Sequence, residues 1–319
     1  MLVEAEHIPF FSLPVLKWPR YISSAWLTFP FRLWGVRSQV KRLLAKLHPS
    51  AVVSMGGFTA TPVIRCAAKM DIPCFTHQLD VEPGLSNRLI ARVCTSVTTS
   101  FEYTKRPFGE RVCDVPLSTP ARFVLKDSPS RTSAAQAFGL DPARSIVLLY
   151  GGGQGARALN EALGKTLKDW LSFTQVIHVT GQGKSDHFKT DLKRGYVVYT
   201  LLDEREMRLA HAAADLEIIR GGIGSLSDVA ALKKAAIVVP MPDSHQEANA
   251  RAFEEQGSVL VFDQRQPTFA EDLLSAARLL LGDHKERQAM GERAHLFFST
   301  DNGTAFAKRI LKELHRPSV

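Results

Sequence analysis

Glycines cluster in the segment GGGQGARALN (151–160), which follows the apolar run SIVLLY (145–150). Closely spaced glycines let backbone N–H groups approach an anion, and a helix that follows them directs the positive end of its dipole at the same point. A phosphate or a diphosphate is therefore the expected ligand. The alternative is a tight turn that only packs a strand against a helix, but four glycines in five residues exceed that need.

The spacing Gly151-x-Gly153-x-x-Ala156 also matches the fingerprint of dinucleotide-binding proteins. That fingerprint needs an acidic residue at the end of the next strand, where it holds a ribose. The segment QVIHVTGQG (175–183) ends without one. The sequence therefore argues against a nicotinamide enzyme.

A second segment, RGGIGSLSDVAAL (220–232), repeats the design of apolar run, glycines and expected helix. Asp228 is placed to accept hydrogen bonds from the two neighbouring hydroxyls of a ribose. The alternative for Ser225 and Asp228 is a capping box, which only satisfies the first amides of the helix. Two such loops do not need two phosphates, since one can hold the diphosphate and the other the nucleoside.

Polar side chains follow two further apolar runs. In PMPDSHQEANARAF (240–253), His245, Gln246 and Asn249 suit a hydroxyl-rich ligand such as a sugar, although polar residues cap helices in many proteins. In THQLDVEPGLSNR (76–88), the titratable candidates are His77, Asp80 and Glu82. A general base must reach the hydroxyl that it deprotonates. We expect His77 and Asp80 to be the catalytic candidates, while a lone histidine at a strand end is more often structural.

Metal-binding signatures are missing from the sequence. It contains no DxD, HExxH or GxxxxGK[ST] pattern, and its four cysteines form no CxxC pair. We therefore expect no metal and no cofactor, and we expect backbone donors and a helix dipole to neutralise a leaving diphosphate.

Strand-like apolar runs alternate with amphipathic segments through most of the chain. Strands are expected at 51–55, 72–77, 96–101, 145–150, 175–180, 196–200, 216–219 and 235–240, and helices at 36–47, 62–70, 85–94, 156–171, 204–214, 225–233 and most of 246–315. This alternation predicts an α/β protein with two doubly wound parallel sheets. The polar stretch KDSPSRTSAAQ (126–136) looks like a linker between two domains. Ligands of such folds bind beyond the carboxyl ends of the strands, where the glycine segments lie.

Charge is concentrated near the N-terminus. The chain has 319 residues with 40 Lys+Arg against 32 Asp+Glu, and residues 1–46 hold seven of the basic residues and only two acidic ones. Aromatic residues interleave with these cations, namely Trp18, Trp26, Phe29, Phe31 and Trp34. This pattern is typical of a membrane-surface patch, with a nucleic-acid surface and a core helix with a solvated basic face as alternatives.

No apolar run reaches the roughly 18 residues that span a bilayer, and the N-terminus does not look like a signal peptide.

In order along the chain, several motifs resemble those of the MurG family, the UDP-N-acetylglucosamine–N-acetylmuramyl-(pentapeptide) pyrophosphoryl-undecaprenol N-acetylglucosamine transferases. They are SMGGFTATPV (54–63), THQLDVEPGLSNRLIAR (76–92), TPAR (119–122), GGGQGARALN (151–160), VIHVTGQG (176–183), AAADLEIIRGGIGSLSDVAAL (212–232) and HQEANARA (245–252). The resemblance implies a GT-B fold of two Rossmann-like domains that face a cleft. It also implies inverting transfer of N-acetylglucosamine from UDP-N-acetylglucosamine to lipid I, giving lipid II for peptidoglycan synthesis.

The resemblance also implies roles for individual residues. Arg122 and Gly153 would lie at the diphosphate, Leu202 would hold the uracil through its backbone, and Gln246 would contact the sugar. Ile223–Ser227 would form the loop around the nucleotide. The full expected substrate-binding set is Asp80, Arg122, Gly153, Gln154, Gly155, Leu202, Ile223, Gly224, Ser225, Leu226, Ser227, Asp228, His245 and Gln246.

The chain departs from the family pattern at several points. The family opens with a strand and a GTGGH-type loop, which this sequence lacks, so we expect an N-domain that is incomplete at its start. Gly153 replaces a serine, Asp228 and Gln78 replace glutamates, and Phe58 stands where tyrosine is common.

We therefore expect a metal-independent transferase, peripheral on the cytoplasmic face of the inner membrane, with no nucleic-acid partner. The expected domains are 1–125 for the acceptor and membrane, 126–300 for the UDP-sugar, and a C-terminal helix within 301–319 that packs back on the first domain. The alternatives are a degenerate, non-catalytic nucleotide-sugar-binding protein and a UDP-sugar epimerase of the same architecture.

Overall fold

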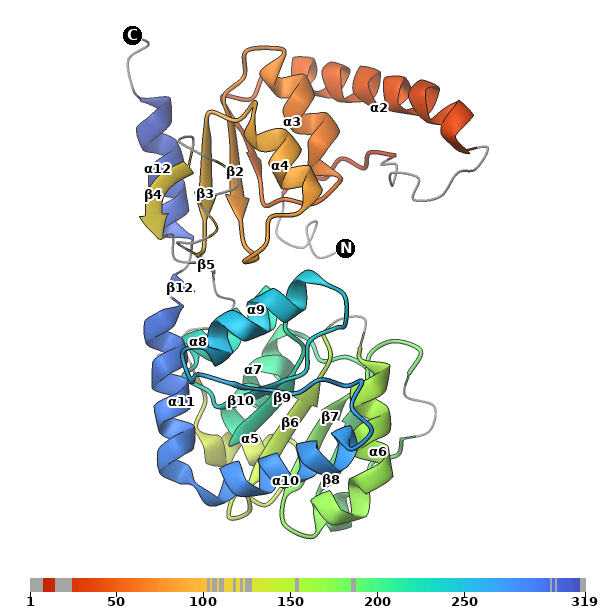
Figure 1. Ribbon diagram of the computed structural model, residues 1–319, viewed down its shortest axis with the longest axis vertical. Coiled ribbons are helices and arrows are strands. Elements are labelled where there is room, and N and C mark those ends of the chain that lie inside the picture. The colour runs from red at the N-terminus through yellow and green to blue at the C-terminus, as the bar shows by residue number, and fades with distance from the viewer. Residues whose placement is uncertain are drawn as a thin grey trace. The chain divides into compact units, whose positions relative to one another are not determined.

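The chain divides into two units (Figure 1). The computed structural model describes residues 8–14, 25–101, 104, 108, 112–116, 119–120, 123, 128–152, 155–184, 188–298, 300–301 and 303–315. Unit 1 comprises Met1–Leu79, Pro83–Pro116 and Lys308–Val319, and unit 2 comprises Asp80–Glu82 and Leu117–Ala307. The short segment Asp80–Glu82 thus groups with unit 2, although the chain on both sides of it belongs to unit 1.

Unit 1 is built on a four-stranded parallel sheet whose order follows the chain. Its strands are β1 (Val52–Ser54), β2 (Cys74–Gln78), β3 (Ser96–Thr99) and β4 (Val112–Pro116). Its helices are α2 (Ala25–Leu47), α3 (Ala60–Ala68), α4 (Leu85–Ala91) and the part of α12 (Thr304–Leu314) from Lys308 on. Parallel neighbours need crossover connections, and α3 and α4 provide them for β1 to β2 and for β2 to β3.

The core of unit 1 explains the helical spacing seen in the sequence. Val36, Val40 and Leu44 recur every four residues on α2, and all three are buried in one cluster with Ile64 and Ala67 of α3. Residues at this spacing lie on one face of a helix. The helix expected at 36–47 is confirmed, but it begins earlier, at Ala25.

Unit 2 contains a six-stranded parallel sheet in the order β11-β10-β9-β6-β7-β8. The strands are β6 (Ile146–Tyr150), β7 (Gln175–Val179), β8 (Tyr196–Tyr199), β9 (Leu216–Ile219), β10 (Ala236–Val238) and β11 (Leu260–Val261). From β6 the chain builds outward through β7 and β8, and it then returns to add β9, β10 and β11 on the other side. This reversal between β6 and β9 is the switch point of a doubly wound sheet.

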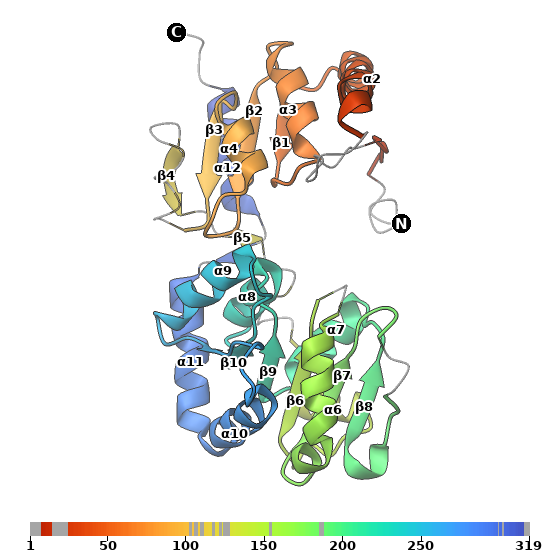
Figure 2. The same cartoon turned by 45° about the vertical axis from the view of Figure 1, so that its right-hand side comes forward.

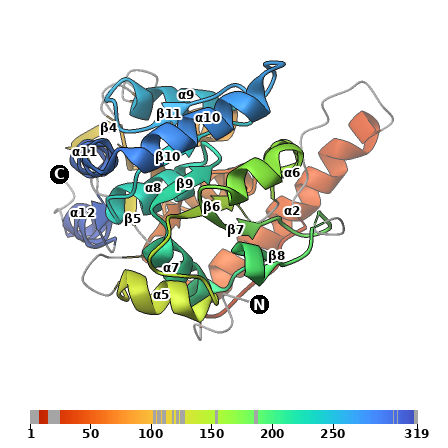
Figure 3. The same ribbon diagram turned by 90° about the horizontal axis from the view of Figure 1, so that it is seen from below.

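Helices cover both faces of this sheet. They are α5 (Arg131–Ala137), α6 (Arg157–Leu171), α7 (Glu204–Ala213), α8 (Ile223–Ala231), α9 (His245–Glu254), α10 (Phe269–Gly282) and α11 (His284–Phe297). Figure 3 shows α5 and α7 on one side of the strands and α6 and α10 on the other. Figure 2 shows α6 lying over the neighbouring strands β6 and β7. The α/β architecture with parallel sheets that we expected is confirmed.

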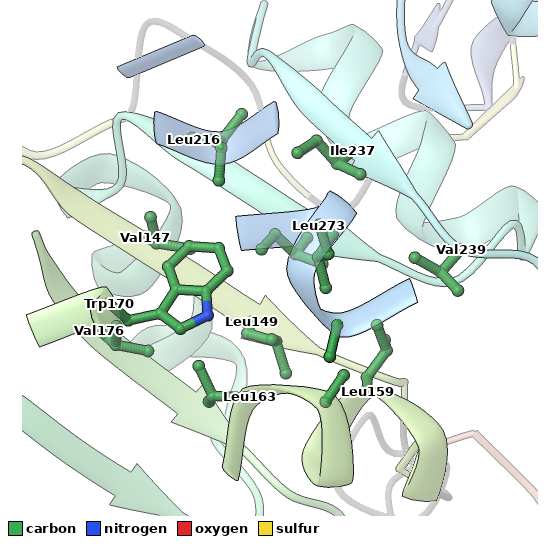
Figure 4. Packing of buried hydrophobic residues seen from close by; sticks show 14 of the residues in the cluster. Val147, Leu149, Leu159, Leu163, Trp170, Val176, Leu216, Ile237, Val239 and Leu273 are labelled. Atoms are coloured by element: carbon green, nitrogen blue, oxygen red, sulfur yellow. The ribbon is translucent and has the colours of Figure 1, made fainter. Parts of the chain in front are cut away.

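The core between α6, α10 and the sheet is dense and almost wholly apolar (Figure 4). Leu159 and Leu163 of α6 and Leu273 of α10 pack against Val147 and Leu149 of β6, and each is at most 1% exposed. Alternate residues of a strand point to the same face, so Val147 and Leu149 share this one. The rigid layer that results supports the loops at the carboxyl ends of the strands.

Two features of unit 2 differ from expectation. The stretch expected as a linker, 126–136, contains most of α5, which begins where the Ser130 hydroxyl accepts a hydrogen bond from the Ser133 amide. Two short strands, β5 (Thr119–Pro120) and β12 (Thr300–Asp301), pair in parallel although they lie near opposite ends of the unit's sequence. Strands of two residues are too short for a hydrophobic period to reveal.

Candidate functional site

Three loops of unit 2 follow three neighbouring strands of the sheet. The first glycine loop (Gly151–Ala156) follows β6, the second glycine loop (Arg220–Gly222) follows β9, and the 240–246 loop follows β10. Because β10, β9 and β6 are adjacent and parallel, these loops meet at one edge of the sheet. The first two flank the switch point, where doubly wound folds bind their ligands.

The first glycine loop has a backbone that only glycine adopts without strain. Gly152 and Gly155 have φ values of +78° and +66°, and the Gly155 amide donates to the Gly152 carbonyl over 2.9 Å. An added Cβ would overlap Ala156 at Gly151 and the Thr180 carbonyl oxygen at Gly155. At Gly152 it would meet no described atom within 4 Å. Packing thus explains why positions 151 and 155 are glycine, whereas Gly152 borders open space near the N-terminus of α6. Gly153 and Gln154 lie outside the described residues.

A network of buried polar side chains holds the backbone against which the first glycine loop packs. His178 of β7 has Nδ1 2.8 Å from the Tyr196 hydroxyl and Nε2 3.0 Å from Asn160 Oδ1. The Asn160 amide in turn donates to the Thr180 carbonyl, against which Gly155 packs. Burial lowers the pKa of His178 to about 3, so the ring is neutral at pH 7. These residues fix the loop in place, and no role could be assigned to them from the sequence because their partners are distant along the chain.

The second glycine loop ends in a helix whose first turn is open. Helix α8 begins at Ile223 with Gly222 at its N-cap, and within the described residues no side chain caps it. Gly224 is exposed, and an added Cβ there would meet no described atom within 4 Å. The first amides of a helix and its positive dipole end together favour an anion or a polar ligand. A Cβ on Gly221 would lie 2.5 Å from the Gln246 carbonyl oxygen, so this glycine permits close approach of α9.

The early start of α8 corrects two expectations. Ser225 and Asp228 do not form a capping box, because both lie inside the helix. The segment Ile223–Ser227 is helix rather than loop; Leu226 is fully buried in the core, and the Ser227 hydroxyl donates to the Ile223 carbonyl over 2.7 Å. Asp228 is only 1% exposed. The accessible part of the expected set on α8 is therefore Ile223, Gly224 and Ser225.

The 240–246 loop places amide groups beside the start of α8. The Ser244 hydroxyl caps α9 by accepting from the Gln246 amide. The Gln246 side chain accepts from the Met241 amide over 3.0 Å, and its Nε2 lies on the side of Gly222. His245, the first residue of α9, has a side chain that is 52% exposed. His245 and Gln246 therefore lie at the start of a helix, as predicted from the sequence, and Gln246 lies beside the N-terminus of α8.

Asp80 joins this group within unit 2. Its Oδ1 accepts a hydrogen bond of 2.9 Å from Asn249 Nδ2 and lies 3.9 Å from His245 Nε2, and its side chain is 30% exposed. Asn249 also donates to the Gly221 carbonyl over 3.2 Å, and its Oδ1 accepts from the Val81 amide over 2.9 Å. Asn249 is fully buried, so it does not face a sugar as the sequence suggested.

Arg220 is a site residue to which we assigned no role from the sequence. Its Nη1 lies within hydrogen-bond distance of the Val239 and Pro240 carbonyls, at 3.0 and 3.2 Å, and of Gln264 Oε1 at 2.7 Å. Burial lowers the pKa of its guanidinium. Arg220 thus ties the second glycine loop to the start of the 240–246 loop.

His77 does not meet the requirement for a general base. It lies on β2 of unit 1 with 0% exposure, and its ring nitrogens lie 2.8 Å from the Thr98 hydroxyl and 3.1 Å from the Ser100 hydroxyl. Burial lowers its pKa to about 4. A buried ring whose two nitrogens are both engaged cannot reach a substrate hydroxyl, so the structural interpretation of His77 replaces the catalytic one.

Leu202 lies at the same edge of the sheet, beyond the carboxyl end of β8. Leu202 lies half-buried in the turn between β8 and α7, before the capping box formed by Asp203 and Glu206. Arg122 lies outside the described residues. Among the residues that the structure describes, no group of three His, Cys, Asp or Glu side chains is arranged to hold a metal ion.

Comparison with known proteins agrees with this architecture. Residues 1–99 match the glycosyltransferase family 28 N-terminal domain, and residues 146–313 match the glycosyltransferase family 28 C-terminal domain. The chain is 33% identical over 315 residues to the UDP-N-acetylglucosamine--N-acetylmuramyl-(pentapeptide) pyrophosphoryl-undecaprenol N-acetylglucosamine transferase of Nocardioides sp., covering 95% of this chain and 84% of that protein. The protein of the same name from Lachnospira eligens is 31% identical, with 89% and 80% covered.

Among solved structures, MurG of Acinetobacter baumannii superposes with a TM-score of 0.70 at 23% identity, covering 98% of this chain and 87% of that one. This likeness shows that the fold is of the GT-B type. The family match covers more than half of the chain, and the relatives above 30% identity extend over most of it. The chain therefore belongs to glycosyltransferase family 28.

Proposed function

We propose that this family 28 glycosyltransferase transfers N-acetylglucosamine from UDP-N-acetylglucosamine to lipid I, an undecaprenyl-diphosphate-linked muramyl peptide. The names of its relatives support this substrate pair. The observation that carries the proposal is the convergence of the two glycine loops and the 240–246 loop on adjacent strand ends. The open space at Gly152 and at Gly224 is where a nucleoside diphosphate can approach the backbone.

In this proposal each loop holds one part of the donor. Gly155 and the neighbouring Gly153 and Gln154 lie at the diphosphate, together with Arg122. Leu202 lies at the uracil, and the accessible start of α8, Ile223–Ser225, lies at the ribose. Gln246, His245 and Asp80 lie at the sugar, where exposed amide, imidazole and carboxylate groups suit hydroxyls.

The reaction is a displacement at C1 of the sugar. The acceptor hydroxyl oxygen bonds to C1 while the bond from C1 to the diphosphate oxygen breaks, and the electron pair leaves with UDP. We propose that backbone amides of the first glycine loop and the dipole of α6 stabilise the charge that develops on UDP. Asp80, a partly exposed carboxylate 3.9 Å from His245 Nε2, is our candidate to receive the hydroxyl proton.

The assay that tests this function uses UDP-N-acetylglucosamine and a soluble lipid I analogue. We expect one sugar to be transferred for each UDP released. Binding of UDP without transfer would favour the non-catalytic alternative, and isomerisation of the sugar without an acceptor would favour the epimerase. Either outcome would contradict the proposal.

A surface of unit 1 supports a membrane location for the transferase. A pocket of about 470 Å³ between α2 and α3 is lined by Trp34, Arg37, Ser38, Lys41, Cys66, Lys69 and Met70. Trp34 is 73% exposed, and three of these seven residues are cationic while none is acidic. An interfacial aromatic ring beside cations suits anionic lipid headgroups. The remaining members of the expected patch are Trp18, which lies outside the described residues, and Trp26, Phe29 and Phe31, whose side chains are not described.

We propose that this pocket docks on the anionic surface of the plasma membrane at its cytoplasmic face. Within the described ranges, no helix combines the length and apolar character needed to cross a bilayer. Sedimentation with phosphatidylglycerol vesicles tests the proposal, with phosphatidylcholine vesicles as the control. We expect Lys41→Glu to weaken binding by about 2 kcal/mol, since each cation near such a surface contributes about 1 kcal/mol and the change reverses a charge. Equal binding by the variant would contradict this role.

A further inference from the structure

The side-chain amide of Asn249 forms hydrogen bonds only with other groups of the protein. Its Nδ2 donates to Asp80 Oδ1 over 2.9 Å and to the Gly221 carbonyl over 3.2 Å, and its Oδ1 accepts from the Val81 amide over 2.9 Å. The residue is 0% exposed. An asparagine amide has two N–H donors and one carbonyl oxygen, and here all three groups are engaged. Asn249 therefore has no group left for a ligand.

Of the groups that Asn249 holds, the Gly221 carbonyl is buried, whereas the Asp80 carboxylate is partly exposed. The Asp80 side chain is 30% exposed and lies 3.9 Å from the exposed His245 ring. Gly221 opens the turn that leads into α8, where the accessible residues Ile223 and Gly224 follow. The buried Asn249 amide therefore connects the turn before α8 to the Asp80 carboxylate.

Resting on the proposed function, we propose that Asn249 is a positioning residue for the sugar end of the donor. By holding the Asp80 carboxylate and the Gly221 carbonyl at once, it fixes the distance between the carboxylate that meets the sugar and the helix start that meets the nucleotide. A group that acts on the sugar of a bound nucleotide has to be held at a fixed distance and orientation relative to the nucleotide. Supporting residues of this kind decide how well exposed polar groups are oriented.

Chemistry explains why an amide occupies this position. Aspartate has the same shape but would place a second carboxylate against Asp80 and against the Gly221 carbonyl. An apolar side chain would remove the hydrogen bond that Asn249 donates to the buried Gly221 carbonyl. Only a neutral side chain that donates twice and accepts once satisfies all three groups.

A double-mutant cycle between positions 249 and 80 tests the inference in the full chain. The four proteins are the natural chain, Asn249→Asp, Asp80→Asn and the double variant, in which donor and acceptor are exchanged. The measured quantities are the affinities for UDP and for UDP-N-acetylglucosamine by calorimetry. The control is Glu254→Gln, which removes an exposed charge from the same helix and should change neither affinity.

We expect Asn249→Asp to weaken binding of UDP-N-acetylglucosamine by about tenfold or more, and binding of UDP alone by less than about threefold. The double variant should bind the nucleotide sugar better than Asn249→Asp does, because position 80 then supplies the missing donor. Equal weakening of UDP and of the nucleotide sugar would overturn the inference. Losses that simply multiply in the double variant would overturn it as well.

The melting temperatures of the same four proteins separate this inference from the proposed function. If the natural chain binds neither nucleotide, the proposed function fails, yet the contact between positions 249 and 80 can still be measured. The double variant should then melt above Asn249→Asp. A double variant that melts at or below that single variant would show that the amide does not hold Asp80.

Discussion

The two glycine loops have the same sequence signature but use their glycines for different physical reasons. In the first loop, Gly152 and Gly155 have positive φ values, and a buried network around His178 holds the turn from below. In the second loop, Gly221 and Gly222 have ordinary backbone angles, and Gly221 instead makes room for the backbone of α9. One loop is shaped by backbone conformation, and the other by its neighbours.

A glycine cluster alone therefore does not reveal how a loop is made rigid. The first loop is supported through the Thr180 carbonyl, which Asn160 of α6 links to His178 of β7. The second is supported laterally, by Arg220 reaching to Val239 and Pro240 and by Asn249 reaching to Gly221. Substitutions in the first loop should therefore act mainly on stability, and those in the second mainly on the geometry of the sugar end.

The largest effect should come from Gly155→Ala. Alanine at a φ of +66° is strained, and its Cβ would also overlap the Thr180 carbonyl, so we expect a loss of about 3–5 kcal/mol in the free energy of unfolding. Gly152→Ala is the matched control, since it carries a similar backbone strain in open space and should cost about 1–2 kcal/mol. Denaturant titration measures both. Equal losses would mean that packing against Thr180 contributes nothing.

Gly221→Ala should disturb the second loop without backbone strain. The added Cβ would lie 2.5 Å from the Gln246 carbonyl oxygen, so α9 must move, at a cost of about 2 kcal/mol. We expect affinity for UDP-N-acetylglucosamine to fall more than affinity for UDP, because Gln246 moves with α9. Gly224→Ala, in open space on α8, should instead raise stability by about 0.5–1 kcal/mol. A calorimetric titration in which both ligands lose affinity equally would argue against the lateral support of this loop.

Acid should weaken the first loop more than the second. The pKa of His178 is about 3 in the folded protein and near 6.5 when unfolded, so between these values the unfolded chain binds a proton that the folded one does not. The contribution of His178 to the stability of unit 2 therefore falls as the pH drops below 6.5, by about 2 kcal/mol at pH 5. Amide hydrogen exchange in β7 and α8 at pH 7 and pH 5 measures the difference. His178→Gln should remove most of this pH dependence, and an unchanged dependence would contradict the assignment.

The smallest effect should come from Arg220→Lys. Lysine keeps the charge but cannot reproduce the contacts of Nη1 with two carbonyls and Gln264, so we expect a loss of about 1 kcal/mol in the free energy of unfolding. The control is Arg265→Lys, whose side chain is half exposed and pairs with surface carboxylates, and which should cost less than about 0.5 kcal/mol. Faster exchange in the first glycine loop of Arg220→Lys would show that the two loops are not independent.

The sequence was most informative where the signal is local. Alternating apolar and amphipathic runs predicted the strands and helices around the site, and the turns rich in glycine predicted its edge. These features follow from the periods of strands and helices, which a short window of residues contains.

Features that depend on distant partners could not be predicted. Asn249 looks like a ligand-facing amide until its contacts with Gly221 and Val81 are known, and His77 looks titratable until Thr98 and Ser100 enclose it. The start of α8 at Ile223 was missed because its N-cap is a glycine, whereas the serine that seemed to be the cap lies two residues into the helix.

The pairing of β5 with β12 has a consequence for biosynthesis. These two-residue strands come from the beginning and the end of unit 2, and their hydrogen bonds close nearly the whole unit into one loop. Contacts between such distant segments form late, because the ends of a long loop must first find each other. On the ribosome, unit 2 can therefore complete its closure only after β12 has emerged from the exit tunnel.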